Sequence, residues 1–413
     1  MIPRTIFVLA FLASRLPCPA QTTAFVNGLW FDGETFAPRT VYSIDGTLVL
    51  ERPASVASTV DLADGYVVPP FGEAHNHNVE PLNKIEPLVA RYLRHGIVYV
   101  KNPNCLPHNG EQLAGRINTP STIDVTFSNG GFTGSGGHPI EFQERNIQRG
   151  IWTKADGEGA FYYVVDNQLE AKWPQLLATK PDFVKTYLLY SEEYDARKDA
   201  AAFFGWKGLD PSMLKKIVEK AHAARLRVSA HIESTADFHN ALAAGVDEIN
   251  HMPGFRMYSD VRPHPVSAFE IGDEDARLAA RQGTYVVTTL MNALDGDKRK
   301  QQDALNVRNL RLLHQAGVRL AIGSDSYRVD ALTEALYLDS LHGLDNLTLL
   351  KMWCETTAQT IFPERKIGYL KDGYEANFIV LGGDPLRDFK NVTKVRLRVK
   401  HGTSLSLPPE VAQ

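Results

Sequence analysis

The chain has 413 residues, 44% of them hydrophobic and 22% charged, and its formal net charge is −4. This composition is ordinary for a globular protein, and the length suffices for one large domain with a smaller one. The small net charge and the lack of a long basic run give no reason to expect a nucleic-acid partner. After the first twenty residues, no stretch is long and apolar enough to span a bilayer.

The first predicted feature is a secretory signal peptide over residues 1–20. Arg4 precedes an apolar stretch from Ile6 to Ala13, and the small-residue end "CPA" precedes Gln21. This order is typical of a signal with cleavage after Ala20, and it predicts a periplasmic or secreted protein. A frayed N-terminal helix is the alternative. Cleavage would leave two cysteines, which are too few for a disulfide framework.

Residues 21–66 and 363–413 share one pattern, although they lie at opposite ends of the chain. Both alternate apolar and polar residues with period two, and the first segment has a hairpin signal at Asp45-Gly46. Neither segment can bury a core alone. We therefore expect the two ends to form one small composite β-sandwich.

Residues 67–362 alternate short apolar runs with amphipathic segments. The runs are rich in β-branched and aromatic residues, as is typical of strands buried on both faces. The predicted strands are 66–75, 96–103, 121–128, 182–190, 227–232, 247–252, 284–290 and 318–325, and the clearest helices are 211–226, 236–245 and 301–317. This repeated alternation predicts an α/β fold, a parallel (β/α)8 TIM barrel.

Polar residues end several of these strands. Two histidines spaced by two, as in "HNH", point to the same face of a strand and can share a metal ion. A lysine inside an apolar strand is costly without a partner. Each residue also has an ordinary explanation, such as a satisfied core histidine or a helix cap. The six residues are His75, His77, Lys185, His231, His251 and Asp325. Chance explains them poorly, because the carboxyl ends of barrel strands meet at one rim.

These motifs make the sequence similar to the amidohydrolase superfamily, above all to its imidazolonepropionase-like and prolidase-like members. The resemblance runs from about Phe25 to Gly402, and it is carried by "EAHNH", "HIESTADFHNALAAGVDEINHMPG", "GVRLAIGSDS" and "TTAQTIFPERKIGYLKDGYEANFIVLGGDPL". Glu73 stands where the family usually has aspartate, and Pro70 and Phe71 replace the usual glycine and aliphatic residue. These departures concern substrate positioning more than metal binding.

The resemblance implies roles for the six residues. His75, His77 and Asp325 would bind one divalent metal ion, and His231 and His251 would bind a second. Lys185 would be carboxylated, and its carbamate would bridge the two ions. Imidazole and carboxylate ligands suit zinc best, although manganese, iron and cobalt stay open. The implied reaction is hydrolysis of an amide-type C–N bond in a peptide, N-acyl amino acid or cyclic amide by a metal-bridging hydroxide, with Asp325 as the catalytic proton acceptor.

Substrate contacts are expected from the loops that follow the strands. The glycine-rich segment 128–141 carries His138, which could hydrogen-bond the substrate carbonyl; the alternative is a flexible connector. Tyr190 and Tyr327 follow strands and could hold the substrate, although aromatic residues there often serve packing. Segments 191–208 and 253–270 are candidate lids.

Other functions stay open at this level. A mononuclear deaminase of the same superfamily lacks the bridging lysine and uses a carboxylate near the fifth strand, where Glu233 lies. A lactonase or esterase fits the same metal pair. A binding protein without catalysis should have lost ligands, and none of the six is missing. The expected partner is a small molecule, and whether the chain forms a homo-oligomer is left open.

Overall fold

The computed structural model describes residues 21–81, 84–154, 162–291 and 294–407, so the predicted signal peptide lies outside the described residues. None of the helices in these ranges combines the length and hydropathy that crossing a membrane requires. The two cysteines in these ranges, Cys105 and Cys354, are buried free thiols.

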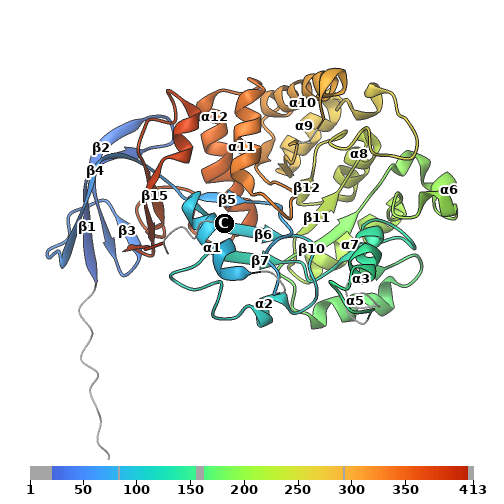
Figure 1. Cartoon of the computed structure of the whole chain (residues 1–413), viewed down its shortest axis with the longest axis horizontal. Coiled ribbons are helices and arrows are strands. Elements are labelled where there is room, and N and C mark those ends of the chain that lie inside the picture. Colours follow the sequence, from blue (N-terminus) through green and yellow to red (C-terminus); the bar gives the residue numbers. More distant parts are fainter. Residues whose placement is uncertain (1–20, 82–83, 155–161, 292–293, 408–413) are drawn as a thin grey trace, which may run out of the picture.

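Both ends of the chain meet in one seven-stranded sheet at one end of the molecule, where blue and red strands lie together (Figure 1). Its strands, in spatial order, are β17 (Thr403–Ser404), β16 (Val395–Lys400), β15 (Phe378–Leu381), β4 (Ser58–Val68), β1 (Thr22–Phe31), β2 (Phe36–Ile44) and β3 (Thr47–Val49). The join is the antiparallel pair β4–β15, in which Val68 faces Ile379. A small core lies on this sheet, with Phe378 against Phe25 and Trp30 at ring-centroid distances of 4.8 and 5.0 Å. The composite of both ends is therefore present as one sheet, and the second layer of a sandwich stays a prediction.

The remaining strands are parallel and form two further sheets. One has the order β14 (Arg319–Ala321), β13 (Tyr285–Val287), β12 (Glu248–Asn250), β11 (Val228–His231), β10 (Val184–Tyr187), β8 (Gly131–Thr133) and β9 (Tyr162–Val164). The other has β5 (Phe71–Glu73), β6 (Ile97–Asn102) and β7 (Asp124–Phe127). Backbone hydrogen bonds connect both edges of the three-stranded sheet to the larger parallel sheet. The Ala74 amide, after β5, donates to the Ile322 carbonyl, after β14, and the Asp182 amide, before β10, donates to the Phe127 carbonyl of β7, each at 2.9 Å. This parallel arrangement is compatible with a barrel.

Helices alternate with these strands, giving a mixed α/β fold. They are α1 (Ile85–Arg94), α2 (Asn109–Gln112), α3 (Ile140–Gln148), α5 (Leu169–Ala178), α6 (Tyr194–Arg197), α7 (Pro211–Ala223), α8 (Thr235–Ala244), α9 (Asp273–Gln282), α10 (Gly296–Gln315), α11 (Ala331–Ser340), α12 (Asn346–Lys351) and α13 (Thr357–Ile361). Some of these helices begin with a side-chain cap. Asp210 caps α7 through the Ser212 amide, and Ser234 forms a capping box with Asp237 at α8.

The glycine-rich segment 128–141 is not the flexible connector that was the alternative above, because it contains strand β8. A Cβ on Gly131 would lie 2.8 Å from the Tyr187 ring and 3.2 Å from the Lys185 Cβ. Glycine therefore permits β8 to lie close beside β10, where Phe132 pairs with Thr186. In this segment Gly131 therefore serves close packing of two strands and does not confer flexibility.

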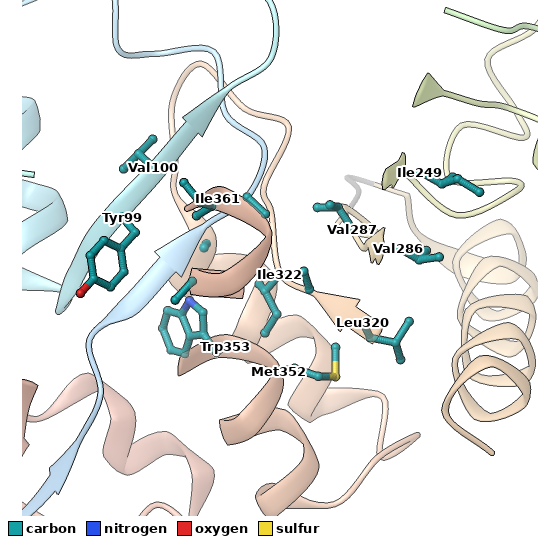
Figure 2. Packing of buried hydrophobic residues seen from close by; sticks show 14 of the residues in the cluster. Tyr99, Val100, Ile249, Val286, Val287, Leu320, Ile322, Met352, Trp353 and Ile361 are labelled. Carbon is teal, nitrogen blue, oxygen red and sulfur yellow. The ribbon is translucent and has the colours of Figure 1, made fainter. Parts of the chain in front are cut away.

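The hydrophobic core fixes strand β5, which directly precedes the paired histidines. Trp353 stacks on Phe71 of β5 with ring centroids 3.8 Å apart and an interplanar angle of 4°, and its indole N–H donates to the Gly72 carbonyl at 2.8 Å. Figure 2 shows Trp353 with Ile361 and Ile322, where the helical segment after Met352 packs against the strand layer. The start of the "EAHNH" motif is thus held by a rigid aromatic contact.

Candidate metal centre and active site

The first metal-ligand group forms where the ends of β5 and β14 meet. His75 and His77 follow β5, and Asp325 follows β14; the Asp325 amide donates to the His75 carbonyl at 2.8 Å. A Cβ on Gly323 would lie 2.8 Å from the His75 Cβ, so glycine is needed for this approach. Asp325 itself has a φ of +46°, a left-handed conformation that turns its side chain at the strand end.

Ligand atoms of His75, His77 and Asp325 all lie within 4.8 Å of one another. The Asp325 Oδ1 is 2.9 Å from His77 Nε2 and 3.4 Å from His75 Nε2. Burial lowers the pKa of His75 to about 3. Burial alone would raise the pKa of Asp325, but hydrogen bonds to His75 and His77 hold it well below its usual value. At neutral pH the group is a neutral imidazole beside an ionised carboxylate, the donor forms that a divalent metal requires.

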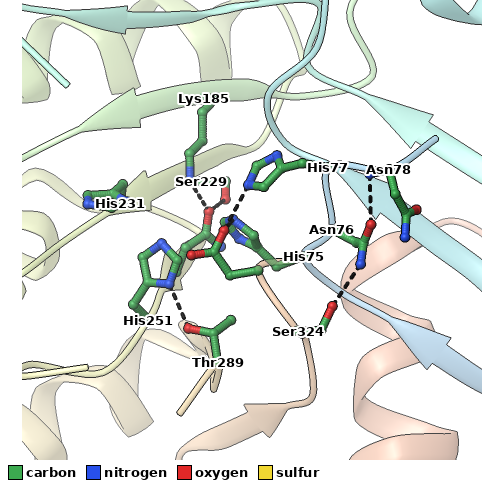
Figure 3. A network of polar contacts seen from close by, with 12 residues as sticks. His75, Asn76, His77, Asn78, Lys185, Ser229, His231, His251, Thr289 and Ser324 are labelled. Atoms are coloured by element: carbon green, nitrogen blue, oxygen red, sulfur yellow. Dashed lines mark hydrogen bonds and ion pairs between the residues drawn. The ribbon is translucent and has the colours of Figure 1, made fainter. Parts of the chain in front are cut away.

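The second group comes from β10, β11 and β12, and Figure 3 shows it facing the first. The rings of His231 and His251 have centroids 4.5 Å apart, and His251 is 4.7 Å from His75. His251 Nδ1 lies 2.6 Å from the Thr289 hydroxyl, which leaves Nε2 available to a ligand. His231 Nε2 lies 3.2 Å from Glu233, which leaves Nδ1. Each ring thus has one nitrogen oriented by a neighbour and one open, as is usual for metal-binding histidines.

Lys185, the β10 member of the second group, is 1% exposed. Its Nζ donates to the Asn250 amide oxygen, which also accepts from the Ser229 hydroxyl at 2.7 Å. Glu248 accepts from Ser229 and Asn250 at 2.8 and 2.9 Å. No carboxylate among the described residues bonds to Lys185 directly, and burial lowers its pKa to about 7. A substantial fraction of this amine is therefore neutral at physiological pH.

All six residues line one cavity of about 160 Å³. His138 and Tyr327, two of the three predicted substrate contacts, line it as well. His138 Nδ1 is 2.5 Å from Glu141, and the Tyr327 ring centroid is 5.3 Å from that of His77. A larger cavity of about 570 Å³ beside Asp124 and Arg365 contains none of the predicted residues, so size does not identify the site.

The third predicted contact, Tyr190, is not among the cavity residues. Its ring is buried, stacks on His264 at 4.5 Å and carries the Arg197 guanidinium at 4.1 Å. Arg197 in turn donates twice to Asp260, so this cluster joins segments 191–208 and 253–270. Tyr190 packs the two candidate lids together and does not point into the cavity.

Sequence reasoning missed several cavity residues. Asn104 follows β6 directly, and the strand-end rule could have found it. Phe142 lies one turn into α3, and no signal in the sequence marks it. Arg256 belongs to a segment predicted as a lid, but its position against His231 depends on the loop conformation.

Sequence comparison connects this site to a known family. The model of the family described as "Amidohydrolase family" matches residues 196–404, a stretch that includes His231, His251 and Asp325. The ochratoxinase of Aspergillus niger is 26% identical over 190 residues, which is 44% of this chain and 37% of that protein. The aligned region thus spans little more than a third of the length of this curated relative.

Solved structures share the fold over nearly the whole chain. The A. niger ochratoxinase structure has a TM-score of 0.71 at 18% identity, and the alignment covers 93% of this chain and 95% of the ochratoxinase chain. A prolidase in complex with N-methylphosphonate-L-proline has a TM-score of 0.70 at 17% identity, covering 94% and 100%. Molinate hydrolase has a TM-score of 0.69 at 16% identity, covering 94% and 95%.

Proposed function

The chain belongs to the amidohydrolase family, and we propose that it is a metal-dependent hydrolase of an amide-type C–N bond. The observation that carries this proposal is the convergence of four imidazoles, one carboxylate and one buried lysine on a single cavity of about 160 Å³. Buried groups with strongly shifted pKa values in one cavity are typical of an active site. The activities named for the similar proteins, ochratoxinase and prolidase, agree with a hydrolase.

The metal ligands of the proposal are those of the two facing groups. His75, His77 and Asp325 would hold one divalent cation, and His231, His251 and a carboxylated Lys185 would hold the second. The donor set supports this, since the pKa values of His75, His231 and His251 are lowered and the carboxylate of Asp325 is ionised. When bound, such cations polarise a carbonyl and lower the pKa of a water from about 15.7 to about 7. Imidazole and carboxylate donors suit zinc.

The chain's own residues would carry the proton and position the substrate. Asp325, partly exposed to the cavity, would take a proton from the attacking water and pass it to the leaving nitrogen. His138, whose Nδ1 contacts Glu141, lines the cavity and would donate a hydrogen bond to the substrate carbonyl. The rings of Phe142, Tyr187 and Tyr327 would exclude bulk water from the reacting bond.

Carboxylation of Lys185 is supported by its surroundings. The reaction needs the neutral amine, which attacks CO2, forms a nitrogen–carbon bond and loses one proton. Burial, which lowers the pKa of Lys185, favours that neutral form. The carbamate nitrogen keeps one N–H, so the hydrogen bond to Asn250 can persist.

The decisive experiment is hydrolysis of a mixed library by zinc-loaded protein. The library would contain dipeptides, N-acyl amino acids, cyclic amides and lactones. We expect release of amines from at least one amide class and two metal ions per chain. Hydrolysis of lactones or esters alone would replace the amide assignment with a lactonase or esterase.

A mononuclear deaminase is disfavoured by the position of Glu233. Its carboxylate bonds to Arg256 at 3.0 Å and is 1% exposed, and it is not among the cavity residues. One metal ion per chain, with ammonia as the product, would nevertheless establish the deaminase.

Two further proposals concern the whole chain. The parallel strands would close into a (β/α)8 barrel, since backbone hydrogen bonds connect both edges of the three-stranded sheet to the larger parallel sheet. The protein would also be exported, and the intact mass of natively produced enzyme should lack residues 1–20. Retention of Met1 on that enzyme would contradict export.

A further inference from the structure

Arg256 is the one described arginine that lines the active-site cavity. Lys185, the other basic residue of its lining, has its Nζ directed to Asn250 beneath the cavity. The remaining lining is imidazoles, aromatic rings, Pro139, Asn104 and Asp325. Arg256 therefore gives this cavity a fixed cation that the proposed hydrolysis does not use.

The contacts of Arg256 leave one edge of its guanidinium open. Its Nε donates to Glu233 Oε1 at 3.0 Å, and Nη2 donates to the same oxygen. A guanidinium has five N–H donors in a fork. Two are used by Glu233, so both donors of Nη1 and one of Nη2 have no partner among the described residues. One N–H from each of these nitrogens forms the end-on fork that fits a carboxylate.

The guanidinium is also held rigidly. It lies 5.1 Å from the Phe255 ring and 5.3 Å from the Trp206 ring, and Trp206 belongs to the other candidate lid segment. Glu233 is buried and fixes the Nε edge. Glu141, another carboxylate whose charge acts on Arg256, bonds to His138 instead. A donor fork held in this way loses little conformational entropy when it binds an anion.

From this geometry we infer that Arg256 binds a carboxylate of the substrate. The inference rests on the proposed function and narrows its substrate class to amides that carry a free carboxylate close to the scissile bond. Neutral amides, ureas and lactones would enter the same cavity without using the Nη1–Nη2 edge. Arg256 is thus a specificity-determining residue, and its contribution should show mainly in KM.

The test compares acid and carboxamide forms of the same compounds. N-acetyl-L-amino acids and their carboxamides would be given to zinc-loaded wild type, Arg256→Met, Arg256→Lys and, as a control, Arg262→Met. Arg262 is exposed, lies in the same segment and pairs with Glu193. We expect wild type and the control to prefer the acids by roughly 10- to 100-fold in kcat/KM. Arg256→Met should lose this preference, and Arg256→Lys, which keeps a charge beside Glu233 but not the fork, should lose part of it.

Equilibrium binding of the same pairs, measured by calorimetry, separates the two proposals. Binding of the acid but not the carboxamide, without turnover, would support the carboxylate site and contradict amide hydrolysis. Equal turnover of acid and carboxamide by wild type, or an unchanged preference in Arg256→Met, would overturn the carboxylate site and leave the hydrolase intact. The wild-type comparison holds even if Arg256→Met fails to fold.

Discussion

Replacing Lys185 distinguishes the proposed site with two metal ions from a site with one. Lys185→Ala removes the proposed bridging group, so we expect loss of at least one metal ion per chain and a fall in kcat of at least about 100-fold. Propionate should restore part of the turnover by standing in for the missing carbamate. Metal analysis and steady-state kinetics would measure both effects.

The control for this variant is Lys215→Ala, which removes an exposed lysine from α7 and should leave both metals and turnover unchanged. If Lys185→Ala binds two metals and turns over normally without added acid, the bridging carbamate is wrong.

Asp325 has two proposed roles, as a ligand and as the proton acceptor. Asp325→Asn keeps the size of the side chain but removes the charge that faces His77 at 2.9 Å. We expect kcat to fall by about 10²–10⁴-fold, the usual contribution of a general base. The variant must be assayed after metal loading, with its metal content measured. A fully metallated Asp325→Asn variant with near-normal kcat would show that another group accepts the proton.

Two ion pairs of equal length, one between strands and one at the end of α6, show how burial determines the contribution of an ion pair to stability. Lys101 on β6 and Glu248 on β12 approach to 2.6 Å with side chains 3% and 2% exposed. Lys198 and Asp195 also approach to 2.6 Å, but their side chains are 41% and 90% exposed. Lys101→Met leaves a buried carboxylate unpaired and should cost about 3–5 kcal/mol in free energy of unfolding. Lys198→Met should cost about 0–1 kcal/mol. Urea denaturation would measure both.

The pH dependence of the buried pair follows from Glu248. Burial would raise its pKa, but Lys101 and Arg227 lower it to about 2. Because the folded-state pKa is depressed, the stabilisation is present above the unfolded-state pKa of about 4.3 and is lost as pH falls toward 2. Glu248→Gln should therefore reduce the dependence of the free energy of unfolding on pH in that window. An unchanged slope would contradict the assignment.

At the level of elements, the sequence predicted the strands better than the segments between them. Each of the seven predicted strands after residue 96 contains an observed one, because runs of β-branched and aromatic residues are buried on both faces. The predicted runs were longer, since residues such as Tyr190 and His251 turn out of the strand with positive φ. Strand β8 was missed because its glycine, Gly131, permits a close approach to β10, which only the folded chain reveals.

For the candidate site, strand-end residues could be predicted and loop residues could not. His231 is the last residue of β11, and His75 and Asp325 follow β5 and β14 within a few residues, so apolar runs mark where these side chains lie. The orientation of Tyr190 and the pairing of Arg256 with Glu233 depend on two long segments that pack against each other. No local pattern encodes such contacts, so loop residues could be named only as candidates.

Across the whole molecule, the small core of the composite sheet should contribute stability without touching the cavity. Phe378 is fully buried against Phe25 and Trp30. Phe378→Ala should cost about 3–5 kcal/mol in free energy of unfolding, because it removes a buried ring and leaves a void. Leu50→Ala, at a position 42% exposed, should cost at most about 0.5 kcal/mol. Equal losses would contradict a separate packed core on this sheet.

The β4–β15 pair also limits when the composite sheet can be completed during synthesis of the chain. The backbone pair of Val68 with Ile379 cannot form until Ile379 is made, and the ribosome adds that residue roughly 300 residues later. At about 5–20 residues per second, the delay is on the order of 15–60 s. Throughout that interval one edge of β4 has unpaired backbone groups and an apolar face, and an open edge of this kind readily pairs with another chain. Until the last strands are made, this edge of β4 is therefore a site where the chain can pair with another copy instead of with β15.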